Sequence, residues 1–366
     1  MNRLIQYGTV EAIPYYNCSR QSFEEWETTG VKRQWLGYPL IVFGTFIELL
    51  YIPIIYIIFK TRLIKHACYK IIVVLAFIDM CATCCSCLIT GPLLILGSVF
   101  CMYPTFTYVA GSFALVVYDR IASLISGDYL FGQGKTYGIA FHEYADVIEK
   151  RLAYFSIVFS ISYGFYMFMF TPTICYNSVW ISWIPDPLSE LTPSEKAADM
   201  YKNRPQAWNN WVFVSCMFIL FSIYCGMVKK IARGQKSKAS MAIFFQCIII
   251  CFFNTVSALI YNALSFVTPD FWILLLGQLC WSINHGCPAL IYITMNETIK
   301  REFKKLVFGI TTKYKNRPQA WNNWVFVSCM FILFSIYCGM VRKIARGQKW
   351  KASMACQLCN TSPVIS

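Results

Sequence analysis

Seven apolar runs of 21 to 27 residues dominate this sequence of 366 residues: 36–59, 71–96, 98–118, 152–175, 208–228, 241–267 and 271–295. A run of this length can cross the hydrocarbon core of a bilayer as a helix, because every backbone hydrogen bond then closes within the segment. Turn-forming residues such as Gly97 and Pro269 separate the runs. The sequence therefore predicts an all-α membrane protein, built as a bundle of seven transmembrane helices.

The composition excludes a soluble protein. Charged residues make up 14% of the chain and hydrophobic residues 57%, whereas about 25% of the residues in soluble proteins are charged. So few charges cannot cover a water-exposed surface, and the many large apolar residues exclude a disordered chain. The first 35 residues contain no apolar run, so we expect no cleavable signal peptide.

Basic residues set the expected orientation. With the N-terminus outside, the inner loops and the stretch after the seventh run hold twenty Lys and Arg residues, and the outer segments hold seven. Because basic residues are enriched in cytoplasmic loops, this distribution predicts an extracellular N-terminus. The net charge of +14 then reflects the inner loops, and we expect no nucleic-acid partner.

An internal duplication follows the seventh run. Residues 201–242 recur as residues 314–355, with 40 of 42 positions identical, which indicates a recent copy and not a solenoid. The copy holds an eighth apolar stretch whose insertion would place basic residues outside, against the charge rule, so we do not expect it to cross. The expected segments are an extracellular one at 1–35, the bundle at 36–295, a cytoplasmic one at 296–313, the copy at 314–355 and a tail at 356–366.

Two polar patterns lie inside the apolar runs. Leu75-Ala76-Phe77-Ile78-Asp79 places a carboxylate at membrane depth, where an acid costs roughly 2.5–3.5 kcal/mol and usually faces a partner. The seventh run contains Asn284, His285, Pro288 and Tyr292. These patterns resemble L-A-x-x-D and N-P-x-x-Y of the rhodopsin-like receptors, which implies that Asp79, Asn284, Pro288 and Tyr292 form an activation switch. The alternative is a neutral Asp79 that only holds two helices together.

Tyr118-Asp119-Arg120 ends the third run at its predicted cytoplasmic boundary. An acid followed by an arginine there resembles the D-R-Y motif of the same receptors, which implies that Asp119 and Arg120 belong to the switch. An arginine that only extends its charge to the membrane surface is the alternative.

Motifs spread over residues 13 to about 305 resemble the nematode serpentine receptors of class T. They include Ile13-Pro14-Tyr15-Tyr16-Asn17-Cys18-Ser19, Leu49-Leu50-Tyr51-Ile52-Pro53, Gly91-Pro92-Leu93-Leu94, Phe131-Gly132-Gln133-Gly134-Lys135, Phe170-Thr171-Pro172 and His285-Gly286-Cys287-Pro288. The stretch from Gly111 to Arg120 is shorter than the third helix of that family, and Asp119 stands where an asparagine is more usual.

The resemblance implies a chemosensory G-protein-coupled receptor of the plasma membrane. A small ligand would contact the outer half of the bundle, and the heterotrimeric G protein would meet residues 229–238 and a short amphipathic helix at 298–305. Anionic membrane lipid is a second partner for both basic segments. The candidate ligand contacts are Tyr108, Trp211, Tyr261, Asn262 and Trp272, although aromatic residues at helix ends also serve as membrane anchors.

Most of the 18 cysteines lie in apolar runs, where Cys behaves as a small hydrophobic residue. We therefore expect no metal or other cofactor. The resemblance to receptors implies a disulfide between Cys101 and Cys175, with Cys18 as the competing partner. Asn17-Cys18-Ser19 is a glycosylation acceptor on the predicted outer side.

Other functions find less support in the sequence. Gly134-Lys135-Thr136 lacks the first glycine of a phosphate loop, and His142-Glu143 lacks the second histidine of a zinc protease, so we expect no enzyme. A ligand-gated channel would need the opposite topology, and a transporter would need inverted repeats. An inactive product of a rearranged receptor gene remains a further alternative, because of the short third helix and the duplication.

Overall fold

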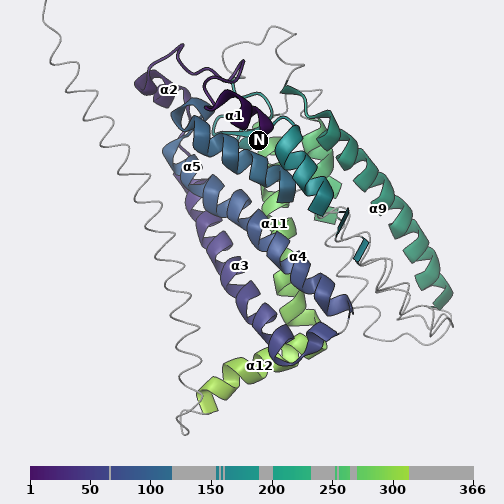
Figure 1. Ribbon diagram of the computed structural model, residues 1–366. Coiled ribbons are helices and arrows are strands. Elements are labelled where there is room, and N and C mark those ends of the chain that lie inside the picture. The colour runs from purple at the N-terminus through teal and green to yellow at the C-terminus, as the bar shows by residue number, and fades with distance from the viewer. Residues whose placement is uncertain are drawn as a thin grey trace, which may run out of the picture. The chain divides into compact units, whose positions relative to one another are not determined.

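The computed structural model describes residues 1–65, 67–117, 154–155, 158–159, 161–188, 201–231, 252–253, 255–263 and 270–312. Long helices make up most of this part of the chain (Figure 1). The chain forms two compact units, residues 1–303 and 304–366, and the features below belong to the first unit unless α12 is named. Among the described residues, two helical stretches, Gln34–Lys60 and Ile72–Leu96, are long and apolar enough to span a membrane.

The helices follow the predicted runs closely in four places. α3 (Gln34–Lys60) contains the first run and α9 (Arg204–Ile231) the fifth. α4 (Ala67–Thr83), the π-helical turn η2 (Cys84–Ile89) and α5 (Thr90–Leu96) form one stretch that contains the second run. α11 (Phe271–Met295) has the predicted bounds of the seventh run. Shorter elements are α1 (Asn2–Tyr7), α2 (Phe23–Thr29), η1 (Leu63–Lys65), η3 (Phe100–Met102), Pro104–Val117, Ile161–Phe170 and 255–263.

Two predicted spans have the wrong ends. The third was expected from residue 98, but α5 ends at Leu96 and is capped by Gly97, which has the left-handed φ of 67° that favours glycine. The next long helix begins only at Pro104, a residue suited to a first helical turn. The fourth was expected to reach residue 175. Its helix ends at Phe170, and the chain continues through Pro172 into a strand, because proline disfavours helical backbone in the residue before it.

The strand after Pro172 belongs to a β-hairpin. β1 (Cys175–Asn177) pairs antiparallel with β2 (Ser182–Ile184), with Cys175 opposite Ile184. The helix Pro104–Val117 lies against the start of the hairpin. A Cβ atom at Gly111 would lie only 1.6 Å from the carbonyl oxygen of Ile174, so this close approach requires glycine.

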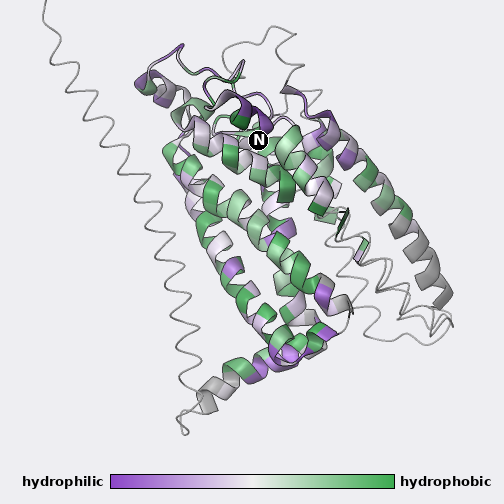
Figure 2. Ribbon diagram, viewed as in Figure 1, coloured by the Kyte–Doolittle hydropathy of each residue, from purple (hydrophilic) through white to green (hydrophobic). Residues whose placement is uncertain are grey.

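α3 packs inward along one face. Ile47, Tyr51, Ile54 and Ile58 are all buried and recur at the spacing of one helical face. They form a cluster with residues of α4 and α11, among them Ala76 and Ala289. Large apolar side chains cover another face of α3 and are exposed, as contact with lipid requires: Trp35, Val42, Phe46 and Phe59. The apolar character of α3 to α5 is evident in Figure 2.

Candidate functional site

Three buried side chains from three helices meet around Asp79. Asp79 lies on α4, Tyr51 on α3 and His285 on α11. The Tyr51 hydroxyl lies 2.8 Å from Asp79 Oδ2, and His285 Nδ1 lies 3.0 Å from Asp79 Oδ1. The exposed fraction is 5% for Asp79, 1% for His285 and zero for Tyr51. Both oxygens of an acid placed at membrane depth are thus hydrogen-bonded, as its desolvation demands.

Tyr51 also joins α3 to the backbone of α11. Its hydroxyl lies 3.0 Å from the carbonyl oxygen of His285, in addition to Asp79 Oδ2. One hydroxyl proton is therefore shared between two acceptors on different helices. Movement of α4 away from α11 would lengthen at least one of these two hydrogen bonds.

The predicted switch residues other than Asp79 lie on α11 or outside the described part of the chain. Asn284 is buried next to His285 in the chain, and Pro288 lies inside α11. Tyr292 is partly buried against the cluster that contains Tyr51. Asp119 and Arg120 lie outside the described residues. The sequence predicted a partner for Asp79 in helix seven, and the structure assigns that role to His285.

Glu48 and Tyr51 are two polar residues that the switch prediction missed. Glu48 lies on α3, one turn before Tyr51, and its Oε1 atom is buried without a hydrogen-bond partner among the residues described. Thr83 Oγ1 and His285 Nε2 are likewise buried without a hydrogen-bond partner among the residues described. A single acid inside the first apolar run was the available signal, because intramembrane acids usually face the bundle interior.

The π-helical turn η2 connects α4 to α5. A π turn leaves carbonyl groups outside the regular α-helical pattern, and such turns are frequent at functional sites. Gln278 of α11 donates to the carbonyl oxygen of Ser86 (2.8 Å), and Thr90 Oγ1 donates to that of Cys85 (2.8 Å). Trp183 of β2 donates from Nε1 to Thr90 Oγ1 (2.9 Å). Hydrogen bonds therefore link the hairpin to α5 and α11 to η2.

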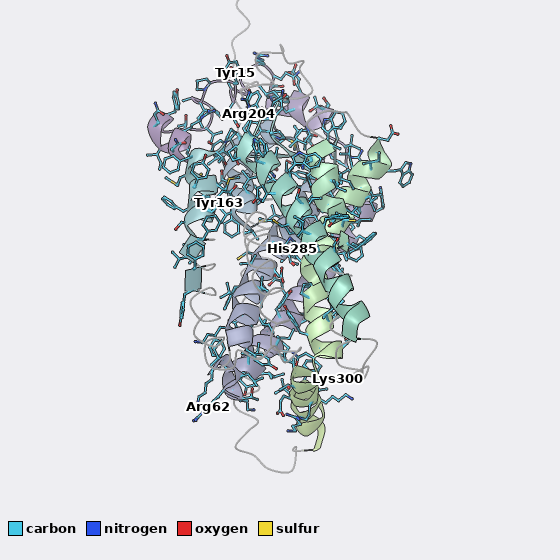
Figure 3. The ribbon with its side chains drawn as sticks, turned by 90° about the vertical axis from the view of Figure 1, so that its right-hand side faces the viewer. Tyr15, Arg62, Tyr163, Arg204, His285 and Lys300 are labelled. Carbon is cyan, nitrogen blue, oxygen red and sulfur yellow. A yellow bond between two sulfur atoms is a disulfide. The ribbon has the colours of Figure 1, made fainter. Side chains whose placement is uncertain are left out.

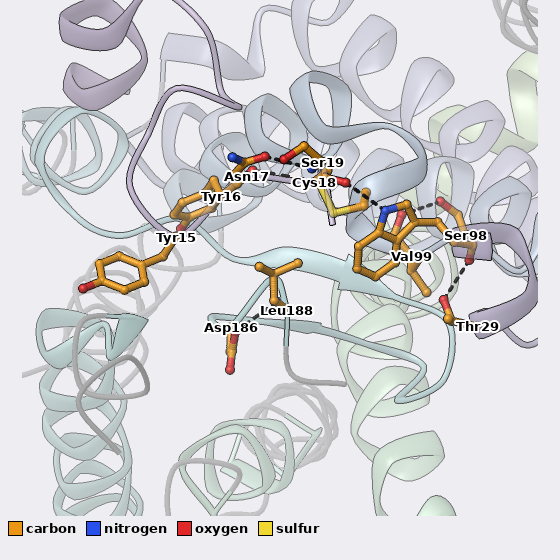
Figure 4. Close-up of a disulfide and its surroundings, with 12 residues drawn as sticks. Tyr15, Tyr16, Asn17, Cys18, Ser19, Thr29, Ser98, Val99, Asp186 and Leu188 are labelled. Carbon is orange, nitrogen blue, oxygen red and sulfur yellow. Dashed lines mark hydrogen bonds between the residues drawn. A yellow bond between two sulfur atoms is a disulfide. The ribbon is translucent and has the colours of Figure 1, made fainter. Parts of the chain in front are cut away.

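The N-terminal segment is part of the folded structure. Val10, Ile13, Tyr16 and Trp26 are buried and cluster with η3, Tyr108 and Tyr201. The Trp26 indole donates to the carbonyl oxygen of Cys18, 3.1 Å away. Figure 4 shows Tyr16 and Cys18 in this segment. The exposed Asn17, the predicted glycosylation acceptor, accepts a hydrogen bond from the Ser19 backbone through its side chain, at 2.8 Å.

The disulfide prediction was wrong in its partner. Cys101 is bonded to Cys18, with 5.4 Å between their Cα atoms, and Cys175 is a buried free cysteine. Both Cys101 and Cys175 lie in the cluster around the N-terminal segment. The packed segment brings Cys18 to Cys101, so the competing partner that the sequence left open is the one observed.

The candidate ligand contacts divide into two groups. Tyr108 and Asn262 are buried, and Asn262 Oδ1 accepts a hydrogen bond from Asn210 of α9, 3.1 Å away. Tyr261 stacks edge-on with Trp281 of α11, with 6.3 Å between ring centroids. Trp272 and Trp211 are 72% and 47% exposed, which is typical of residues at a membrane surface. Tyr108, Tyr261 and Asn262 are thus the candidates that lie inside the packed structure, and all five candidates stay predictions.

The Asp79 cluster lies between the two ends of the first unit. In Figure 3, Tyr15 and Arg204 lie at one end, Arg62 and Lys300 at the other, and His285 between them. α12 (Glu297–Thr312) contains Lys300 and is longer than the predicted 298–305. It buries Ile299 and exposes Arg301, Lys304 and Lys305, so the predicted amphipathic helix is confirmed.

No group of three or more His, Cys, Asp or Glu side chains is arranged to hold a metal ion within the described part of the chain. The buried groups around Asp79 and η2 form hydrogen-bonded links between helices. Such an arrangement suits a protein that changes its packing when a ligand binds.

Comparison with known proteins identifies relatives of this architecture. The sequence pattern of a family described as the serpentine type seven-transmembrane chemoreceptor Srt, a G-protein-coupled receptor family, matches residues 3–313 and again residues 308–366. The second match includes the copied block. Serpentine receptor class T-55 of Caenorhabditis elegans is 21% identical over 308 residues, which cover 80% of each chain.

Proposed function

Because the chain belongs to the Srt family of serpentine seven-transmembrane chemoreceptors, we propose that it senses a small extracellular ligand at the plasma membrane and signals to a heterotrimeric G protein. Its family is one of multi-pass membrane receptors and not of enzymes. In this proposal the N-terminus is outside, as the twenty inner and seven outer basic residues favour.

The hydrogen-bonded cluster of Asp79, Tyr51 and His285 is the observation that carries the proposal. It ties α3, α4 and α11 together through two side-chain contacts and one side-chain-to-backbone contact. A ligand changes the conformation only if it binds one packing of the helices more tightly than another. A buried cluster with one shared proton can rearrange between two such packings, because each packing can satisfy a different set of acceptors.

A connected route leads from the outer side to this cluster. Trp183 of the hairpin is hydrogen-bonded to Thr90, and Gln278 of α11 to the π turn. Gln278 lies seven residues before His285, so the two side chains lie on the same face of α11. Displacement of the hairpin or of the outer part of α11 by a ligand would therefore reach the cluster. Tyr108, Tyr261 and Asn262 are the proposed contacts.

The G protein is proposed to meet the basic residues of α12. Arg301, Lys304 and Lys305 of α12 are exposed, and Ile299 anchors the first turn of this helix. Residues 232–238, which hold most of the basic third loop, lie outside the described part of the chain. Anionic lipid attracts the same groups by about 1 kcal/mol per basic residue, and both contacts can exist at once.

Topology is the first test. Short epitope tags at the N-terminus, beside Lys236 and at the C-terminus are compared for antibody access in intact and permeabilised cells. An accessible N-terminal tag and a protected tag beside Lys236 would support the receptor. The reverse pattern would overturn it and favour a channel of inverted topology.

Signalling is the second test, and it needs no known ligand. Membranes that contain the chain and a G-protein α subunit are assayed for basal nucleotide exchange. We expect Asp79→Asn to change the exchange rate by about fivefold or more, the lower range of ordinary coupling between sites. Glu24→Gln removes an acid from the exposed side of α2 and is the matched control. Unchanged exchange in Asp79→Asn at normal surface levels would contradict a switching role.

A further inference from the structure

Tyr16 occupies a site formed by three other aromatic rings. Its ring centroid lies 5.5 Å from that of Phe100, 5.4 Å from that of Tyr108 and 5.7 Å from that of Tyr201. All three contacts are edge-to-face, with interplanar angles of 71° to 76°, which is a preferred geometry of aromatic pairs. Tyr16 itself is 1% exposed. The three surrounding rings come from different parts of the chain and together surround one ring.

Around Tyr16, buried side chains of the N-terminal segment alternate with exposed ones. Ile13 and Tyr16 are buried, whereas Pro14, Tyr15 and Asn17 between and beside them are exposed. Local backbone hydrogen bonds are limited to single turns, from Ile13 to Val10 and from Tyr16 to Ile13. The insertion of Tyr16 therefore does not depend on a helix or strand that would have to unfold for the ring to leave.

The backbone beside Tyr16 is strained. Tyr15 has a φ of 70°, in the left-handed region that non-glycine residues seldom adopt. Strain of this kind persists where surrounding contacts enforce it, and it is concentrated at ligand clamps and switch regions. Here the hydrogen bond from the Tyr201 hydroxyl to the Tyr15 carbonyl oxygen, 2.7 Å long, holds the strained residue in place. Release of Tyr16 would also release this strain.

A disulfide anchors the segment two residues after Tyr16. Cys18 is bonded to Cys101, which directly follows Phe100 of the ring cluster. The disulfide keeps Tyr16 close to its site even when the ring has left, so that the ring returns as an intramolecular competitor at high effective concentration. Figure 4 shows Tyr15 and Tyr16 beside this disulfide.

We propose that Phe100, Tyr108 and Tyr201 form a binding site for a small monocyclic aromatic ligand of the size of a phenol, and that Tyr16 fills this site as a tethered substitute when no ligand is bound. The inference rests on the proposed receptor function for its biological role. The site shares Tyr108 with the ligand contacts proposed above, and the inference names a ligand class for it. It also explains why Tyr108, a predicted ligand contact, is covered by the N-terminal segment.

The test uses p-cresol, which reproduces the tyrosine side chain. The full chain in lipid nanodiscs is titrated with p-cresol as wild type, Tyr16→Ala and Ile13→Ala. Ile13→Ala is the matched control, because it removes a buried side chain of the same segment and leaves the Tyr16 ring in place. We expect Tyr16→Ala to bind one p-cresol per chain about tenfold or more tightly than the other two, a difference of about 1.4 kcal/mol. Equal binding in the three chains would overturn the proposal.

A second measurement keeps the proposal testable if Tyr16→Ala does not fold. Wild-type chain is photolabelled with a diazirine-bearing phenol, with and without excess p-cresol, and labelled peptides are identified by mass spectrometry. We expect labelling of Phe100, Tyr108 or Tyr201 that p-cresol suppresses. Labelling confined to other regions would overturn the proposal. Neither measurement uses signalling, so failure here would leave the receptor function standing, and failure of the topology test would leave the binding result unchanged.

Discussion

The sulfur atom of Cys18 is bonded to that of Cys101, across 83 residues of sequence. The bond fixes the N-terminal segment to the turn that precedes the helix Pro104–Val117. In the chain-entropy description, closing a loop of this length stabilises the folded state by about 4–5 kcal/mol. The segment before the first long helix thus belongs to the folded core.

Cys18→Ser should lower the thermal stability of the chain and its surface level, because the loop constraint is lost. Cys175→Ser is the matched control, because Cys175 is buried in the same cluster but not bonded. Thermal unfolding of purified chains, with peptide mapping under non-reducing conditions, measures both effects. A stability loss in Cys175→Ser as large as that in Cys18→Ser would contradict the observed pairing.

Tyr51→Phe should destabilise the chain by roughly 1–3 kcal/mol, the cost of leaving a buried acceptor unsatisfied. The substitution removes the hydroxyl that is shared by Asp79 and the His285 carbonyl but keeps the ring. Tyr56→Phe on the exposed side of the same helix is the control. Denaturation curves of the two variants should differ clearly, and coincident curves would show that the hydroxyl does not hold the helices together.

Arg33→Lys should destabilise the end of the bundle where α3 begins. The Arg33 guanidinium donates to the carbonyl oxygens of Ser178 and Val179 and lies 5.2 Å from the Phe271 ring centroid. An ammonium cannot match this planar arrangement, and a hydrogen bond from a charged group contributes about 1.5–3 kcal/mol. Lys32→Arg, at an exposed position, is the control. Equal melting temperatures for Arg33→Lys and wild type would argue against the contact.

Asp186→Asn should stabilise the chain at neutral pH. Burial raises the pKa of the Asp186 carboxyl, and the hydrogen bond from the Leu188 backbone offsets part of this effect. Because the folded-state pKa lies above the unfolded value, the folded state binds the proton more tightly. The protonated Asp186 therefore contributes its full stabilisation of the fold at a pH below the unfolded-state pKa. This contribution is lost as the pH rises through the folded-state pKa.

The measurement for Asp186 is the melting temperature of both chains between about pH 3.5 and 7.5, a range that begins near the ordinary pKa of Asp. Asparagine keeps the oxygen that accepts from Leu188. The variant should gain stability over wild type as the pH rises. A constant difference at every pH would show that ionisation of Asp186 does not carry the effect.

The sequence predicts helices best where apolar length decides the structure. The bounds of α11 follow from its apolar run, and α3 differs from the prediction by only a few residues. The end of the fourth helix was wrong because apolar residues continue past Pro172 into β1. In that stretch hydrophobicity does not distinguish a helix from a buried strand.

At the candidate site too, the sequence predicted some features, and others depended on how the helices pack. Asp79 was predicted from the high energetic cost of an acid in the membrane, and the structure shows it buried with two partners. The choice of Tyr51 and His285 depends on how α3 and α11 turn toward α4, which one sequence does not specify. The pairing of Cys101 with Cys18 depends likewise on the packing of Ile13, Tyr16 and Trp26.

The π turn at Cys84–Ile89 also rotates the side chains of α5 around the helix axis relative to those of α4. Successive residues of an α-helix are rotated by about 100° around its axis, and a π turn holds roughly one residue more than an α turn. A helical wheel drawn from Asp79 at constant pitch therefore assigns Thr90 and Leu94 to the wrong side. A relative without this turn would present the same residues to different neighbours, so aligning the two requires a one-residue gap inside an apolar helix.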